Sequence, residues 1–281
     1  MIDYTLKNIM SKTTGLKRNT IDKYYTSDKA VQSCMGFIQE HINISSTDVC
    51  IEPSAGNGAF IPAIQSVFSN YMFYDLEPEN DFITQQDYLT FEYTKDEDST
   101  AKVHVIGNPP FGRQSSLAIK FIKKSAKFCD SISFILPKSF KKDSLKKHFP
   151  LKFHLMFEFD LPTDSFLVDG KTYDVPCVFQ IWEKKAVNRK VPIKLVPSKF
   201  KFVKKEDNPD ISFRRVGVNA GLIDTNCDKS VQSHYFISFD NPVTEELLLL
   251  LHSIKYECKN YTVGPKSISK QELIKEFNPI L

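Results

Sequence analysis

Residues 48–60 read DVCIEPSAGNGAF, and this stretch decides the fold class. A short apolar run ends at the carboxylate of Glu52, a turn containing Gly56 and Gly58 follows, and residues 59–69 have the apolar spacing of a helix. A strand, a glycine turn and a helix in this order form the first part of a βαβ unit, the building block of parallel sheets. Glycines at such a turn let the backbone approach a ligand closely, and the free N–H groups of the helix start favour a negative or electron-rich partner.

The same alternation of strands and helices continues along the chain. Further strands are expected over 71–78, 102–110 and 131–137, with helices over 28–42 and 115–128. Alternating elements with short turns predict a mostly parallel sheet covered on both faces, and such sheets bind ligands beyond the carboxyl ends of their strands. Glu52, Asp75, Asp87 and Asn108 each fall where a strand should stop. We therefore expect these four side chains to gather at one edge of the sheet.

The pattern changes after residue 150. Aromatic-rich runs over 152–162 and 174–185, separated by a polar loop over 163–173, predict an antiparallel pair at the edge of the sheet. A composition break follows near 186–190, and short apolar runs over 191–196 and 211–223 predict a small β-rich extension with helices over 242–259 and 267–277. The expected organisation is a basic arm over 1–24, a main α/β domain over 25–186 and a small α+β extension over 187–281.

Composition is that of an ordinary globular protein. The 281 residues are 41% hydrophobic and 25% charged, which leaves room for one substantial core and an appendage. The six cysteines are scattered, without a CxxC pair or histidines at metal-ligand spacing, so no metal site is expected and the thiols should be reduced. No signal-peptide pattern and no apolar run of membrane-spanning length occurs, which predicts a soluble, intracellular protein.

Positive charge is concentrated in two stretches although the formal net charge is only +3. The first is a run of lysines between 120 and 152, which includes Lys141 and Lys142, and the second lies between 189 and 215 and includes Arg214 and Arg215. Clustered cations of this kind are typical either of a nucleic-acid surface or of a solvated face. These four residues are the candidate nucleic-acid contacts, and charge alone does not identify the partner.

Four motifs in one order resemble the class I S-adenosylmethionine-dependent methyltransferases of the N6-adenine, amino-methylating kind. They are KYYTSDKAV at 23–31, EPSAGNGAF at 52–60, QQDYL at 85–89 and NPPF at 108–111, and the resemblance extends from residue 23 to about 185. It implies a Rossmann-like methyltransferase fold, with the catalytic domain over 25–186 and the extension at 187–281 in the place where γ-type enzymes carry target recognition.

The resemblance also implies which residues hold S-adenosylmethionine. Tyr25 and Thr26 would line its methionine end, Glu52 and the glycine loop would surround the amino acid and sugar, and Asp75 would hold the ribose hydroxyls, as the acid ending the second strand does in related nucleotide sites. The implied cofactor residues are Tyr25, Thr26, Glu52, Ala55, Gly56, Gly58, Asp75, Leu76, Asp87, Tyr88 and Asn108. Leu76 would pack on the cofactor adenine, Asp87 would accept from its amino group and Tyr88 would flank its ring.

The NPPF tetrapeptide, residues 108–111, fits the catalytic signature of this family. An adenine N6 amine is a poor nucleophile because its lone pair is delocalised into the ring. The Asn108 side-chain oxygen and the Pro109 carbonyl can accept its two hydrogens, and the fixed torsions of Pro109 and Pro110 hold the backbone extended. Phe111 would stack on the flipped base. The transfer needs positioning and charge complementarity, without a metal or a covalent enzyme intermediate.

The motif does not identify the polymer that carries the amino group. Asn-Pro-Pro-aromatic motifs also occur in enzymes that methylate glutamine amides in proteins and amino groups of RNA bases. The motif order favours adenine in DNA, although the extension is small for a recognition domain. Adenine-N6 methylation of RNA at an unpaired or cap position, and a catalytically idle nucleic-acid-binding scaffold, remain the alternatives.

Overall fold

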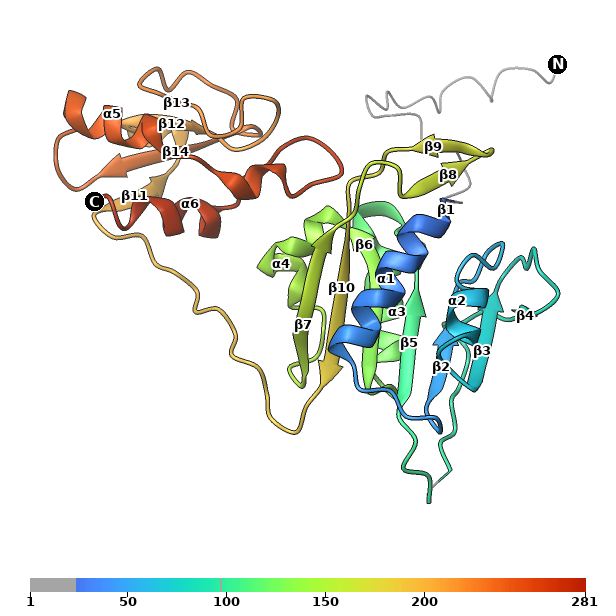
Figure 1. Ribbon diagram of the computed structural model, residues 1–281. Coiled ribbons are helices and arrows are strands. Elements are labelled where there is room, and N and C mark those ends of the chain that lie inside the picture. Colours follow the sequence, from blue (N-terminus) through green and yellow to red (C-terminus); the bar gives the residue numbers. More distant parts are fainter. Residues whose placement is uncertain (1–23, 97) are drawn as a thin grey trace, which may run out of the picture.

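The computed structural model describes residues 24–96 and 98–281, so all of the expected basic arm except Tyr24 lies outside the described residues (Figure 1). Its centre is a seven-stranded sheet with the strand order β4-β3-β2-β5-β6-β10-β7. The bounds in that order are Thr84–Gln85, Asn70–Asp75, Val49–Glu52, Val103–Gly107, Ser131–Pro137, Cys177–Lys184 and Phe153–Asp160. The first five strands are parallel, and β10 runs antiparallel to both β6 and β7. The predicted Rossmann-like sheet with an antiparallel edge hairpin is confirmed.

Strand order reverses at β2. The chain builds outward from β2 to β3 and β4 on one side, and then returns to place β5 and β6 on the other side. This topological switch point is where open α/β sheets leave a crevice beyond the carboxyl ends of their strands. The first strand of the chain's βαβ pattern, which ends at Glu52, therefore lies at the position best suited to hold a ligand.

Helices cover both faces of the sheet. Helix α1 (Asp28–His41) and the short α2 (Ile61–Gln65) pack on one face in a cluster with Cys50, Ile106 and Ile135, and α3 (Ser116–Ser125) packs on the other with Ile51, Val105 and the remaining core. The alternation of neighbouring residues between the two clusters is that of strands buried on both sides. Helix α1 begins as predicted, with the Ser27 hydroxyl accepting from Ala30 N.

A small sheet not predicted from the sequence lies beyond the carboxyl edge. Strands β8 (Phe166–Val168) and β9 (Lys171–Tyr173) form a hairpin within the expected loop, and β8 pairs with β1 (Tyr25–Thr26). The turn between β8 and β9 has positive φ angles at both Asp169 and Gly170, the requirement of a tight hairpin turn. The loop was expected to be irregular because it is polar, although its Asp169-Gly170 pair is typical of a hairpin turn.

The extension contains an antiparallel sheet of order β11-β14-β12-β13, followed in the chain by helices α5 and α6. The bounds are Phe200–Val203, His234–Phe239, Ile211–Arg214 and Ile223–Asp224 for the strands, and Glu245–Ser253 and Lys270–Phe277 for the helices. Its buried residues form a hydrophobic cluster of their own. The predicted β-rich extension is confirmed in kind, but β14 was not predicted.

Residues 191–196 were expected to form a strand, and this is wrong: no helix or strand lies between Lys184 and Phe200. The segment has no partner strand, and instead the Gln271 and Asn278 side chains of the α6 region bind its backbone at Leu195 and Val196. The extended connection is visible in Figure 1 as the long segment that leaves β10. The domain boundary at 186 stays a prediction. Within residues 24–96 and 98–281, none of the helices combines the length and the apolar character needed to cross a membrane.

Candidate active site

Asn108 follows β5 directly and is fixed to the start of the described chain. Its Nδ2 donates to the main-chain carbonyl of Tyr24 at 3.2 Å and lies 3.4 Å from Thr26 Oγ1. A carbonyl oxygen can only accept, so the Tyr24 contact assigns the nitrogen of the amide to that side. The Asn108 Oδ1 atom is therefore turned away from Tyr24 and keeps its capacity to accept hydrogen bonds.

The β1–β8 pairing positions Tyr25 and Thr26. Tyr25 pairs with Leu167 and Thr26 with Phe166, so the hairpin that follows β7 holds the predicted aromatic-Thr motif against the sheet edge. A Cβ built on Gly56 would lie 3.7 Å from the Tyr25 ring, which puts that ring directly on the glycine loop. The Tyr25 hydroxyl donates to the carboxylate of Glu79 at 2.7 Å.

Glu52 is a buried carboxyl group at the switch point. It is 2% exposed, and its Oε2 has no hydrogen-bond partner among the described residues. Gly107 forms the adjoining wall, with a φ of +149° and a position at which a Cβ would lie 3.2 Å from Glu52 Cγ. Burial, together with the nearby Asp75 charge, raises the pKa of Glu52 to about 8. A cationic ligand group at this edge would give the Glu52 carboxylate the positively charged partner that it lacks among the described residues.

Asp75, at the end of β3, joins its strand to the glycine loop. Its Oδ2 accepts from Gly56 N at 2.8 Å and its Oδ1 accepts from Glu77 N at 2.9 Å. Each carboxylate oxygen can accept a second bond, so hydroxyl groups of a ligand can still be held there. The next residue, Leu76, is 63% exposed, which leaves an apolar side chain open at the same edge.

The glycine loop itself is a compact turn. Ala55 N donates to Tyr74 O at 2.9 Å, and Gly58 N donates to Ala55 O at 2.7 Å. Gly58 has a φ of +86°, and a Cβ there would lie 2.8 Å from Ile61 Cδ1 and 2.9 Å from Asn80 Nδ2. The positive φ favours glycine at this position, and a Cβ would in addition require the ends of the Ile61 and Asn80 side chains to move.

The structure separates Asp87 from Tyr88. Asp87 is exposed, with Oδ1 accepting from Leu89 N in a local turn, whereas Tyr88 is 1% exposed and packs on Phe121. The Tyr88 hydroxyl donates to Ser125 Oγ at 2.8 Å, because Ser125 gives its own hydrogen to Phe121 O. The Tyr88 ring therefore belongs to the core in this structure, and Asp87 alone of the two is open to a ligand.

The NPPF segment leads into a strained turn. Pro109 is buried, and Phe111 is half-buried against the α1-side core. Positive φ angles follow at Gly112, Gln114 and Ser115, of which the last two are not glycine. Residues held in such conformations cost of order 1–3 kcal/mol each and tend to occur at functional sites. The Phe111 carbonyl accepts from Leu117 N at 3.2 Å, which ties the tetrapeptide to the start of α3.

Two residues of this site were missed in the sequence. Ser54 Oγ donates to the main-chain carbonyl of Asn108 at 3.2 Å, and the Glu79 carboxylate accepts a hydrogen bond from the Tyr25 hydroxyl. Ser54 lies inside the glycine loop and could have been suspected from its place there. Glu79 lies in an irregular segment after β3, and no pattern in the sequence indicates that it meets Tyr25.

The four cations predicted to contact nucleic acid all have partners within the protein. Lys141 pairs with Asp160 at 2.8 Å, and Lys142 Nζ donates to Ser267 O at 2.8 Å and pairs with Glu272. The contacts of Lys142 attach the extension to the segment that follows β6, whereas Lys141 binds the end of β7. Arg214 Nε donates to Val216 O, and Arg215 donates to Gln232 O.

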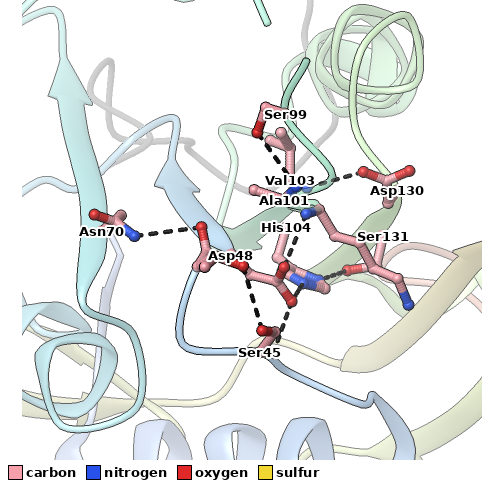
Figure 2. A network of polar contacts seen from close by, with 11 residues as sticks. Ser45, Asp48, Asn70, Ser99, Ala101, Val103, His104, Asp130 and Ser131 are labelled. Carbon is pink, nitrogen blue, oxygen red and sulfur yellow. Dashed lines mark hydrogen bonds and ion pairs between the residues drawn. The ribbon is translucent and has the colours of Figure 1, made fainter. Parts of the chain in front are cut away.

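A second polar cluster lies at the opposite edge of the sheet (Figure 2). His104 Nδ1 lies 2.7 Å from Ser131 Oγ and its Nε2 lies 3.2 Å from Asp48 Oδ2. A carboxylate only accepts, so Nε2 donates to Asp48 and the neutral ring accepts from Ser131. The order resembles a catalytic triad, but all three residues are at most 3% exposed and lie at the amino ends of β2, β5 and β6. The cluster binds the strand starts together, since Asp48 also accepts from Ser45 N and Lys102 N.

Neither family models nor curated protein sequences match this chain. Among solved structures, it is similar to a candidate RNA methyltransferase from Pyrococcus horikoshii, with a TM-score of 0.47, 16% identity and coverage of 61% of this chain and 92% of that one. It is also similar to the 23S rRNA methyltransferase ErmE, with a TM-score of 0.43, 10% identity and coverage of 58% and 71%. The chain is also similar to a type I restriction-modification methyltransferase subunit from Streptococcus thermophilus, with a TM-score of 0.41 and 14% identity. That match covers 57% of this chain and 45% of the other. The fold assignment here rests on the strand order and register.

Proposed function

We propose that the protein transfers the methyl group of S-adenosylmethionine to the exocyclic N6 amino group of an adenine in DNA. The observation that carries the proposal is the orientation of Asn108 at the switch point of the sheet. Its nitrogen is held by the Tyr24 carbonyl, so its oxygen is the atom available to an incoming amine. The order of the Tyr-Thr, glycine-loop and NPPF motifs supports the same reaction.

The residues at the carboxyl edge fit the cofactor. Glu52, with a buried oxygen that has no partner among the described residues, suits the cationic part of the molecule, and the Tyr25 ring on Gly56 forms a wall beside it. Asp75 retains acceptor capacity for ribose hydroxyls, and exposed Leu76 and Asp87 are available to an adenine ring. When bound, S-adenosylmethionine supplies an electrophilic methyl group on a sulfonium. Ala55 and Gly58 shape the loop, whereas Tyr88 packs in the core on the α3 side of the sheet.

The NPPF segment would prepare the amine. Asn108 Oδ1 and the Pro109 carbonyl accept its two hydrogens and so draw the nitrogen toward tetrahedral geometry, which frees its lone pair for attack. With S-adenosylmethionine bound, the nitrogen–carbon bond would form as the carbon–sulfur bond breaks, and the excess proton would leave to water. Ser54, by donating to the Asn108 carbonyl, fixes the backbone that aims these acceptors. Phe111 provides the ring on which a flipped base stacks, and Pro110 keeps the segment extended.

One assay separates this proposal from its alternatives. Labelled methyl transfer is measured on duplex DNA, single-stranded DNA and RNA, and the modified nucleoside is identified. N6-methyldeoxyadenosine from DNA is the expected product. Labelling confined to RNA would overturn the DNA assignment, and labelling of a different amino group would overturn the adenine assignment. Absence of both transfer and calorimetric cofactor binding would indicate the idle scaffold.

A further inference from the structure

We infer that the C-terminal sheet carries a docking surface for single-stranded DNA, centred on His234; the inference rests on the proposed function for the choice of polymer. Two hollows share His234 in their lining, one of about 280 Å³ and one of about 230 Å³. Both are smaller than the roughly 300–1,000 Å³ typical of small-molecule sites. An extended polymer that crosses both fits better than one compact ligand.

The first hollow combines aromatic rings with uncompensated positive charge. Phe202 and Tyr235 line it, and Lys270 Nζ lies 4.4 Å from the Phe202 ring centroid and 5.7 Å from that of Tyr235. Lys204 belongs to the same lining, and neither Lys204 nor Lys270 has a carboxylate partner within residues 24–96 and 98–281. The rings hold the Lys270 ammonium at the rim without neutralising it.

The second hollow continues the positive charge. Arg214 lines it, and in the described part of the chain its Nε binds the Val216 carbonyl and its guanidinium pairs with no carboxylate, so it keeps its full charge. The two acids in the hollow linings are Glu206 and Asp224, and Asp224 is paired with Lys229 at 2.8 Å. A groove that combines cations with aromatic side chains is the pattern that binds the backbone and bases of an unpaired strand.

The surface is connected to the candidate active site through α6. Lys270 begins α6, and Glu272 in its first turn pairs with Lys142, which follows the end of β6. Because β6 runs parallel to β5, its carboxyl end lies at the same edge as Asn108. In Figure 1 the C-terminal sheet likewise lies toward the end of the molecule that carries β8 and β9. A strand held on the His234 surface can thus continue toward that edge.

Binding of a labelled 20-nucleotide single-stranded DNA, followed by fluorescence anisotropy without cofactor, tests the inference. The double variant Lys204→Ala/Lys270→Ala should bind at least about tenfold more weakly, and the slope of log K against log salt should flatten by about 1.4, because each phosphate contact on a single strand contributes about 0.7. The matched control is Lys102→Ala/Lys152→Ala, two exposed lysines that precede β5 and β7 at the opposite edge. It should bind within about twofold of the wild type.

Equal weakening by both double variants, or tighter binding of duplex DNA, RNA or polyglutamate than of the single strand, would overturn the inference. If methyl transfer is absent and only the Lys204/Lys270 variant loses binding, the proposed function fails and the surface stands. If methyl transfer proceeds and the Lys204/Lys270 variant binds the strand normally, the docking surface is overturned and the proposed function stands.

Discussion

The Asn108 side chain donates to the main-chain carbonyl of Tyr24, a residue 84 positions earlier in the chain, at 3.2 Å. This bond joins the end of a central strand to the segment just before β1 and determines which way the amide faces. Without it the amide could turn its nitrogen toward the substrate, where a donor would oppose the amine hydrogens. In the proposed reaction the β8–β9 hairpin would therefore help to position Asn108, because β8 pairs with β1.

Replacing Asn108 by alanine should lower methyl transfer by at least about 100-fold, the usual loss when one preorganised polar group is removed from a reacting centre. Cofactor affinity, measured by calorimetry, should change by less than about threefold, since Glu52, Asp75 and the glycine loop are untouched. Ser54→Ala removes the bond to the Asn108 carbonyl but keeps the side chain that faces the amine, so it should lower transfer by less than Asn108→Ala does. A large loss of cofactor affinity in Asn108→Ala would contradict the assigned role.

Glu52→Gln should change how stability depends on pH. The pKa of Glu52 is raised to about 8 by burial and by Asp75, so the folded protein binds this proton more tightly than the unfolded chain, whose glutamate has its ordinary pKa near 4.5. The stability that Glu52 contributes is complete below pH 4.5 and is lost as the pH rises toward 8, with a slope of at most about 1.4 kcal/mol per pH unit. Urea unfolding at several pH values should show that the free energy of unfolding of the variant rises relative to that of the wild type between pH 5 and 8. A constant difference would mean that Glu52 stays ionised in the folded state.

The same carboxyl group should couple cofactor binding to proton release. A cationic ligand beside Glu52 favours its ionised form and so lowers its pKa. Calorimetric titration with S-adenosylmethionine near pH 7 should therefore release part of a proton, seen as a binding enthalpy that differs between phosphate and Tris buffers. Glu52→Gln should abolish the difference. Equal proton release by the variant would assign the effect to another group.

Gly107→Ala should destabilise the protein by about 1–3 kcal/mol, because its φ of +149° disfavours a side chain and the new Cβ would lie 3.2 Å from Glu52 Cγ. The matched control is Gly36→Ala in α1, where a Cβ meets no atom within 4 Å. That change should be neutral or stabilising by up to about 1 kcal/mol, since alanine is the better helix former. Thermal unfolding of both variants checks the pair, and equal destabilisation would mean that the Glu52 wall is not tightly packed.

The parallel core could be predicted because its signals are local. The run that ends at Glu52, the glycines that follow it and the Ser27 cap each determine the structure of their immediate neighbours. Long-range pairings could not be predicted: nothing near Tyr25 indicates that it pairs with Leu167, or that its hydroxyl meets Glu79. The same limit applies to the cations. Lys142 belongs to a run typical of a nucleic-acid surface, yet its partners Ser267 and Glu272 lie far along the chain and leave its side chain only 12% exposed.

His104→Gln should weaken the dependence of the free energy of unfolding on pH below about pH 6.5. Burial lowers the pKa of His104 below its usual 6.5, and the hydrogen bond to Asp48 opposes this only in part, with Asp130 and Lys102 acting from farther away. The folded state therefore binds this proton less readily than the unfolded chain, so the contribution of His104 is present above pH 6.5 and is lost as the pH falls below it, by at most about 1.4 kcal/mol per pH unit. The variant should be less stable at pH 7.5, because Ser131 and Asp48 lose their shared partner, but the gap to the wild type should narrow toward pH 5. Urea unfolding at pH 5, 6, 7 and 7.5 measures the gap, and a gap that widens toward pH 5 would mean that His104 is charged in the folded protein.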